Sequence, residues 1–263
     1  MVILRNETNM GPGAARNKGI EKAIALDIPY LMFADADDQI YNCLAVEMLV
    51  STLLDNEVDL VCGAFYEELE GVLSIHEYFD IWLFGKIYRT NIIKDHNIRF
   101  PLVGINEDVC FNLHYWIGSG AKNQIKEILY LWKNNPNSIT RKNNHVYTQT
   151  SFAPLCRNLA ITYEAIMEDS AISEEQILLS LPNRIIRMFL GYNRYLTDPE
   201  AKPYLEDMMD ALKELNKKVF EHYWSKITAT MLTEAWMEIL QEGMPDYVPN
   251  LSIHEFIKKI REE

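Results

Sequence analysis

Three aspartates within four positions are the residues of this chain best suited to chemistry. Asp35, Asp37 and Asp38 follow an apolar stretch from Tyr30 to Phe33, which predicts a buried strand. Carboxylates this close repel one another unless a cation or hydrogen-bond donors compensate their charge. Open α/β sheets bind ligands at the carboxyl ends of their strands, and Mg²⁺ and Mn²⁺ prefer oxygen ligands. The pattern therefore predicts a metal-assisted phosphate or diphosphate site.

Helix capping is the alternative explanation for the same aspartates. The residues from Leu44 to Leu54 predict a helix, and capping would make Asp37 or Asp38 its N-cap. The sequence around these residues leaves both explanations open.

A second acidic pair, Glu107 and Asp108, leads into a predicted apolar helix through Leu113 and Trp116. Acidic residues in a first helical turn interact favourably with the helix dipole, so capping also explains this pair. A carboxylate at such a junction equally suits a general base.

Two further segments are candidates for binding an anion. The turn Gly11-Pro12-Gly13 precedes a helix predicted over 14–25, whose first N–H groups are available to an anion. Lys86 and Arg89 lie in an aromatic and apolar segment that starts at Trp82. These two cations either bind a ligand or pack their stems in the core with their charged ends in solvent.

The elements that must position these residues alternate between strand and helix up to about residue 150. Short strands are predicted over 2–4, 30–33 and 58–64, helices over 14–25 and 44–54, a hairpin over 65–74, and an edge strand over 125–132. Alternation of this kind predicts an α/β fold with a mostly parallel, Rossmann-like sheet.

From about Ser151 the pattern becomes helical throughout. Helices are predicted over 152–167, 173–190, 202–217, 220–241 and 253–261, with breaks near Pro182, Pro199, Pro203, Pro245 and Pro249. The expected seam of this all-helical domain comprises Phe189, Met208, Leu212, Phe220, Met231 and Trp236. Met208, Met209, Phe220, Tyr223 and Trp224 are alternatively a partner or acceptor surface. The sequence thus predicts two domains, 1–150 and 151–263.

Composition narrows the classes of function. The 263 residues are 48% hydrophobic and carry a formal net charge of −13, which argues against a nucleic-acid-binding surface. Cys43, Cys62, Cys110 and Cys156 lie in apolar segments without a CxxC pair, so we expect buried, reduced thiols and a cytoplasmic protein. No apolar run reaches the length of a membrane-spanning helix.

Taken together, the motifs resemble family 2 of the inverting nucleotide-sugar glycosyltransferases, which have the GT-A fold. The resemblance covers roughly the first half of the chain, and several motifs in the right order are more specific than any one alone. The segments that carry it are, in order, Asn9–Ile20, Asp35–Asp38 as the metal-binding DxD motif, Gly85–Arg89, Ile98–Pro101, Asn106–Val109 and Asn135–Thr140.

The resemblance implies roles for individual residues. Asp35 and Asp37 would bind a divalent cation, Mn²⁺ or Mg²⁺, together with the ribose or diphosphate of the donor, and Asp38 would support them as a third metal residue. Asp108 would be the base that deprotonates the acceptor hydroxyl, with Glu107 as the second candidate. The residues expected at the nucleotide-sugar, for which a UDP-sugar is the leading candidate, are Asn9, Gly13, Arg16, Asp35 and Lys86.

The resemblance also leaves alternatives open. Family members usually begin with a strand, a helix and a second strand that bind the nucleotide base, whereas Met1 lies where the third strand would start. The expected function is a metal-dependent inverting glycosyltransferase in polysaccharide or glycoconjugate synthesis, with a carbohydrate or lipid-linked acceptor. Its C-terminal helices would bind acceptor or mediate homo-oligomerisation. A non-catalytic remnant serving as a protein-interaction module and a phosphohydrolase are the alternatives.

Overall fold

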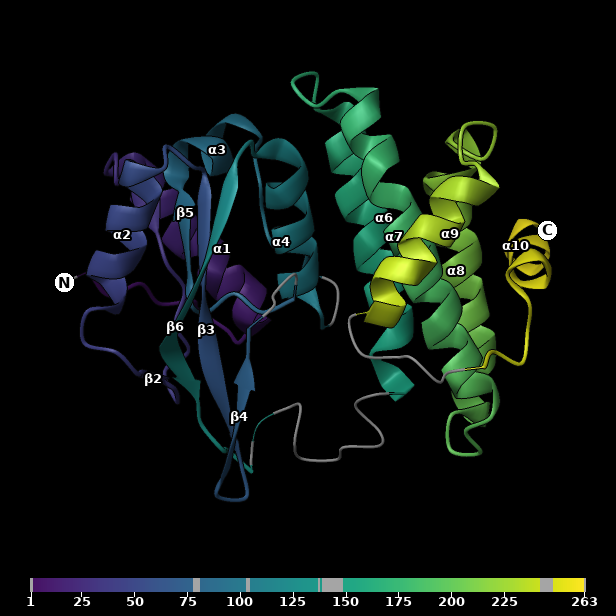
Figure 1. Cartoon of the computed structure of the whole chain (residues 1–263), viewed down its shortest axis with the longest axis horizontal. Coiled ribbons are helices and arrows are strands. Elements are labelled where there is room, and N and C mark those ends of the chain that lie inside the picture. Colours follow the sequence, from purple (N-terminus) through teal and green to yellow (C-terminus); the bar gives the residue numbers. More distant parts are fainter. Residues whose placement is uncertain are drawn as a thin grey trace. The chain divides into compact units, whose positions relative to one another are not determined.

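The chain folds into an α/β unit and a helical unit, as Figure 1 shows for a computed structural model. The structure describes residues 2–77, 81–102, 105–136, 138, 149–241 and 248–262. The first unit lies within Met1–Leu102 and Glu107–Lys142, and the second within Val103–Asn106 and Asn143–Glu263. An α/β part followed by helices agrees with the fold class predicted from sequence.

The sheet of the first unit is mostly antiparallel, so the prediction of a mostly parallel sheet is wrong. Its strand order is β1-β5-β3-β6-β2, and β4 pairs with β3. Among the described pairs, β3–β6 is parallel and the other four are antiparallel. The strands are β1 Tyr30–Leu31, β2 Gln39–Ile40, β3 Leu60–Leu69, β4 Val72–His76, β5 Lys86–Arg89 and β6 Lys122–Trp132.

The reason for this error is strand order. Strands β1, β3 and β6 run in one direction, as their helical connections require. However, β5 inserts antiparallel between β1 and β3, and β4 returns from β3 through a tight turn in which Glu70 and Gly71 both have positive φ. Positive φ at both central residues is typical of the type I′ hairpin. Local periodicity does not specify where a strand inserts.

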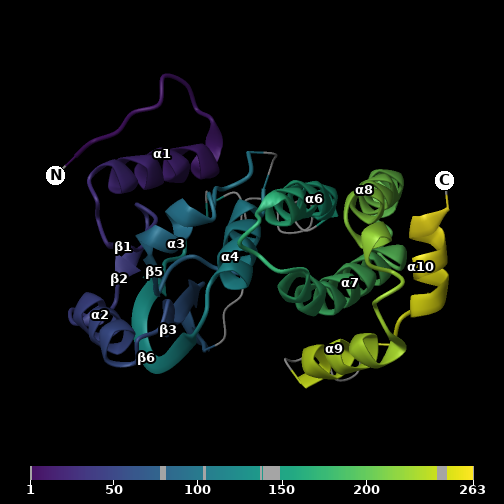
Figure 2. The same ribbon diagram turned by 90° about the horizontal axis from the view of Figure 1, so that it is seen from above.

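Helices cover both faces of the sheet (Figures 1 and 2). Helix α2, Ala45–Asp55, packs Leu49 and Leu53 against Val61 of β3. The opposite face carries α1 Gly11–Ala25, α3 Thr90–Asp95 and α4 Glu107–Gly118. Neighbouring residues of β3 point to opposite faces, as in any strand, so both layers of the core pack against the same strands.

Several local expectations are corrected by the structure. Val2, Ile3 and Leu4 lie outside any strand and are 58%, 68% and 41% exposed. The predicted edge strand is β6, which lies between β3 and β2. Cys43 is exposed, whereas the other three cysteines are buried, and all four are free thiols.

The second unit consists of helices packed around a shared core. Capping boxes at Ser173 and Ser252 set the starts of α7 and α10, and Pro182 lies inside α7 without ending it. None of the helices within the described ranges is long and apolar enough to cross a membrane. The helices are α6 Phe152–Glu168, α7 Glu174–Leu196, α8 Leu205–Lys218, α9 Ala229–Gln241 and α10 Ile253–Arg261, with short 3₁₀ helices Lys202–Tyr204 and Phe220–His222.

The predicted seam of this unit is largely buried. Phe189, Met208, Leu212 and Phe220 are at most 1% exposed, while Met231 and Trp236 are partly buried. Tyr223 is 5% exposed, so Phe220 and Tyr223 pack in the core rather than at an acceptor surface. The break near Pro245 falls outside the described residues.

Candidate active site

The acidic residues Asp35, Asp37 and Asp38 form a tight turn between β1 and β2. The Asp38 amide donates to the Asp35 carbonyl at 3.2 Å. The Tyr130 hydroxyl of β6 accepts a hydrogen bond from the Asp35 amide at 3.0 Å and donates one to Asp38 Oδ2 at 2.9 Å. The segment after β6 adds two bonds, because the Lys133 amide donates to Asp38 Oδ1 at 3.0 Å and Asn135 Nδ2 donates to Asp37 Oδ2 at 2.7 Å. Hydrogen bonds from the end of β6 and the residues just after it therefore fix the shape of the turn.

These contacts decide against the capping explanation. The N-cap position of α2 is Leu44, whose amide donates a hydrogen bond to Asn42 Oδ1. Both Asp38 oxygens accept hydrogen bonds from β6 and the segment after it. Partial burial raises the pKa of Asp38, while the hydrogen bonds from Tyr130 and Lys133 lower it. Asp38 thus acts on the shape of the turn.

Arg16 of α1 joins this turn to the second acidic pair. Its guanidinium binds Asp35 Oδ1 at 2.7 Å and Glu107 Oε1 at 2.8 Å, and it lies over the Phe100 ring at 5.6 Å from the ring centre. The side chain of Asp35 is 44% exposed, so this carboxylate faces solvent on one side. One cation therefore brings the aspartate turn and the start of α4 into a single site.

Helix α1 approaches α4 closely because of Gly13 and Asn17. A Cβ at Gly13 would lie 3.2 Å from Glu107 Cγ, from Phe100 Cβ and from the Pro101 carbonyl oxygen. Asn17 exchanges two hydrogen bonds with the Phe100 backbone, at 2.8 and 2.9 Å. The close approach that Gly13 permits is thus to protein, one turn from Arg16.

Asp108 has the electrostatic character of a general base. Burial, followed by the charge of Glu107, raises its pKa to about 6, while the Val109 amide and Arg16 act in the opposite direction. Glu107 is 8% exposed and its carboxylate is paired with Arg16. The protonation of Asp108 therefore changes near pH 6.

Two predicted site residues make their described hydrogen bonds outside this cluster. Lys86 is 1% exposed, and its Nζ donates to the Trp82 carbonyl at 2.6 Å, so its charged end does not reach solvent. Asn9 accepts a hydrogen bond from the Gly11 amide and shapes the turn before α1. The sequence did not indicate the contacts that Tyr130 makes with the acidic turn, because its apolar segment predicts a core residue. It also did not indicate that Asn17 binds the Phe100 backbone. Asn135 was noted only as part of the segment Asn135–Thr140 that carries the family resemblance.

The carboxylates of the acidic turn could supply some, but not all, of the ligands of a divalent cation. Among the residues described, no group of three His, Cys, Asp or Glu side chains is arranged to hold a metal ion. Asp35 and Asp37 each use one carboxylate oxygen in a described hydrogen bond. Two carboxylates with free oxygens match the usual mode of Mg²⁺, which takes one or two protein carboxylates and completes its shell with substrate phosphates and water.

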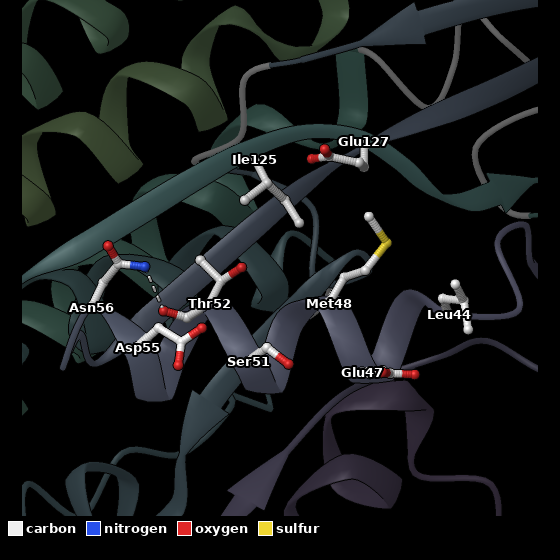
Figure 3. Close-up of a pocket in the computed structure, with 9 residues that line it drawn as sticks. All are labelled: Leu44, Glu47, Met48, Ser51, Thr52, Asp55, Asn56, Ile125 and Glu127. Atoms are coloured by element: carbon white, nitrogen blue, oxygen red, sulfur yellow. Dashed lines mark hydrogen bonds between the residues drawn. The ribbon is translucent and has the colours of Figure 1, made fainter.

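A separate surface pocket lies between α2 and β6 (Figure 3). Its volume is about 320 Å³, and none of the predicted site residues lines it. It opens beside the core layer formed by α2, whereas Arg16 belongs to α1 on the other face of the sheet. Its lining residues are Leu44, Glu47, Met48, Ser51, Thr52, Asp55, Asn56, Ile125 and Glu127.

Known proteins resemble this chain in sequence and in fold. The family described as Glycosyl transferase family 2 matches residues 1–106. The uncharacterized glycosyltransferase YibD of Escherichia coli is 24% identical over 75% of this chain and 71% of its own length. The uncharacterized glycosyltransferase EpsJ of Bacillus subtilis is 27% identical over 51% of this chain, which spans about half of that relative's length.

A crystal structure of S. aureus TarS in complex with UDP-GlcNAc has a TM-score of 0.64. The superposition covers 89% of this chain and 70% of the TarS chain, with 18% sequence identity. At this identity, the likeness shows a shared fold and nothing about function. The family match, the relatives and the GT-A architecture agree with the motif order that the sequence predicted. Residues 1–106 therefore match family 2 of the glycosyltransferases, and the chain has a GT-A-like unit followed by a helical unit.

Proposed function

We propose that this protein is a metal-dependent, inverting glycosyltransferase that moves a sugar from a UDP-sugar to a hydroxyl group. Its acceptor is a carbohydrate or lipid-linked glycan, and its place is polysaccharide or glycoconjugate synthesis in the cytoplasm. The observation that carries the proposal is the double ion pair of Arg16 with Asp35 and Glu107. This pairing supports the proposal because it joins the carboxylate turn to Glu107, the neighbour of the candidate base Asp108. The donor is inferred from TarS, which has been crystallised with UDP-GlcNAc.

The donor side of the site is the acidic turn. We assign Asp35 and Asp37 as ligands of Mn²⁺ or Mg²⁺ and of the donor, with Asp38 in support. A divalent cation, when bound, neutralises the diphosphate leaving group. Asn9 keeps the nucleotide-side role expected from the resemblance. Gly13 packs against Glu107 and Lys86 donates to the Trp82 carbonyl, so we assign these two residues structural roles.

The acceptor side is Asp108 at the start of α4. Its carboxylate takes the proton of the acceptor hydroxyl as that oxygen attacks the anomeric carbon. The bond from the anomeric carbon to the diphosphate oxygen breaks at the same time, and the electron pair leaves with the diphosphate. A single displacement inverts the anomeric centre, so no protein nucleophile is required.

Thermal denaturation with Mn²⁺ and UDP tests the donor site. A ligand that binds only the native state adds about 2.7 kcal/mol of stability at about 100 times its Kd. We expect the midpoint to rise with Mn²⁺ plus UDP, and we expect EDTA to reverse the rise. Asp37→Ala should abolish the shift, whereas Asp55→Ala, at the end of α2, should retain it. An equal shift in both variants would contradict the assignment of Asp37.

The product of the reaction tests the chemistry itself. Acceptor-dependent transfer with inverted configuration supports the proposal, whereas free sugar formed without any acceptor requirement would instead indicate a phosphohydrolase. A wild-type protein whose midpoint responds to no nucleotide would favour the interaction-module alternative.

The helical unit has a proposed role in acceptor binding or self-association. Its described surface includes Leu179 and Met237, which are 70% and 51% exposed. Light scattering coupled to size exclusion tests self-association. A monomer at every concentration measured would leave acceptor binding as the assigned role.

A further inference from the structure

The hydroxyl group of Tyr130 holds both ends of the acidic turn. It accepts the Asp35 amide hydrogen bond at 3.0 Å and donates to Asp38 Oδ2 at 2.9 Å. A hydroxyl is the side-chain group that donates and accepts at one atom, and phenylalanine has neither capacity. We propose that Tyr130 is a positioning residue of the donor site, whose hydroxyl fixes the turn so that Asp35 and Asp37 present their carboxylates to cation and donor. This inference rests on the proposed function.

The ring of Tyr130 is itself fixed, so its hydroxyl has a defined position. Tyr130 is 3% exposed and stacks on Phe84, with ring centres 4.6 Å apart and planes 6° from parallel. Its backbone pairs with Phe65 of β3 on one side and with Ile40 of β2 on the other. Strand pairing on both sides fixes the backbone of Tyr130, and stacking on Phe84 fixes its ring. The position of its hydroxyl relative to the sheet is therefore fixed as well.

The neighbouring bonds to the turn explain why this hydroxyl matters for Asp37. Asp37 lies between the two residues that Tyr130 contacts, and Asn135 holds its Oδ2 at 2.7 Å. The Lys133 amide holds the second oxygen of Asp38 at 3.0 Å. Without the Tyr130 hydroxyl, the Asp35 amide loses its described hydrogen-bond acceptor. The Asp38 carboxylate loses the bond to Oδ2 and keeps the one from the Lys133 amide to Oδ1. The turn then keeps its composition but loses its fixed shape.

Tyr130→Phe is the direct test, and Tyr115→Phe is its matched control. The Tyr115 hydroxyl has the same bonding pattern, because it accepts the Arg89 amide at 2.8 Å and donates to the Asp59 carbonyl at 2.7 Å. Tyr115 is fully buried and contacts neither the acidic turn nor Arg16 in its described hydrogen bonds. Both variants lose one buried hydroxyl, so a general loss of stability should be similar in the two.

Titration calorimetry with Mn²⁺ and UDP gives the first readout. We expect Tyr130→Phe to weaken UDP binding about tenfold, which corresponds to about 1.4 kcal/mol, because the turn loses two hydrogen bonds. With donor sugar, its KM should rise while kcat at saturation changes less. Tyr115→Phe should keep the wild-type affinity. Equal affinity in Tyr130→Phe and wild type would overturn the inference.

Amide hydrogen exchange without ligand gives the second readout. The peptide covering residues 35–38 should exchange faster in Tyr130→Phe than in wild type, and at the wild-type rate in Tyr115→Phe. Unchanged exchange in Tyr130→Phe would overturn the inference even if the wild-type protein bound no UDP. Failure of wild-type binding alone would refute the proposed function, so the two failures are distinguishable.

Discussion

Glu107 and Asp108 are adjacent in sequence but lie in different electrostatic environments. Glu107 is paired with the Arg16 guanidinium at 2.8 Å. Asp108 has its pKa raised to about 6 by burial and by the charge of Glu107. A catalytic base is most effective when its pKa lies near the working pH, so these environments favour Asp108 as the proton acceptor.

The pH dependence of transfer should report Asp108. Because the base must be ionised, kcat/KM is expected to fall as pH drops below about 6. Asp108→Asn should remove transfer while leaving the Mn²⁺ and UDP thermal shift intact. Full turnover by Asp108→Asn would exclude Asp108 as the base.

The same raised pKa predicts a gain in stability for Asp108→Asn. The folded-state pKa lies above the ordinary value of 3.8, so the native state binds more protons than the unfolded state between these values. The stabilising contribution of Asp108 is therefore complete below about pH 4 and lost as pH rises through about 6. We expect Asp108→Asn to be about 1 to 2 kcal/mol more stable than wild type at pH 8 and no more stable at pH 3.5. Urea denaturation at the two pH values measures this difference, and a gain of equal size at both would contradict the assignment.

Arg16 should set the position of the acidic limb of the pH profile. The positive charge of Arg16 lowers the pKa of Asp108 directly. It also pairs with Glu107, whose negative charge raises the pKa of Asp108. Arg16→Gln removes both effects, so the limb is expected to move to higher pH, and donor affinity should also fall because Asp35 loses its partner. Arg194→Gln, an exposed position in the last turn of α7, is the control and should leave the profile unchanged. Rate profiles of the two variants decide between a role at the site and a general effect of charge.

At the scale of elements, the contact between α1 and the start of α4 depends on one glycine. Gly13 has Phe100, Pro101 and Glu107 atoms 3.2 Å from where a Cβ would lie, whereas nothing lies within 4 Å of the same position at Gly19. Both glycines belong to α1.

The two positions should respond oppositely to alanine. Gly19→Ala is expected to stabilise the protein by up to about 1 kcal/mol, because alanine loses less backbone entropy in a helix. Gly13→Ala should destabilise it by about 1 to 3 kcal/mol through overpacking, and it should weaken activity by displacing Glu107. Chemical denaturation and kcat/KM measure the two effects. A Gly13→Ala protein as stable as Gly19→Ala would show that α1 and α4 do not need this close contact.

At the scale of the whole molecule, every residue assigned to the chemistry lies in the first unit. We therefore expect Mn²⁺ and UDP to slow hydrogen exchange in peptides covering 9–17 and 35–38, while helices α6, α7 and α8 change little. Exchange measured with and without ligand by mass spectrometry tests this. Protection spread evenly over both units would contradict a donor site built from the first unit alone.

Much of this molecule could be predicted from its sequence. Helix α10 matches its predicted bounds, α6 ends one residue later than predicted, and α2 both begins and ends one residue later. Capping chemistry and helical periodicity are local signals, so they specify where a helix begins and ends. The acidic turn and the Glu107–Asp108 pair were also identified, because carboxylates at the ends of predicted elements are visible without tertiary structure.

The sequence by itself determined the kinds of chemistry and the order of the parts: carboxylates after a strand, an acidic pair at a helix start, and helices after residue 150. Only the tertiary structure decided that β5 runs antiparallel between β1 and β3, that Lys86 is buried, and that Arg16 and Tyr130 contact the acidic turn. Arg16 and Glu107 are 91 positions apart, and Tyr130 and Asp35 are 95 apart. Contacts over such separations form when strand order closes long loops, and they leave no trace in local periodicity.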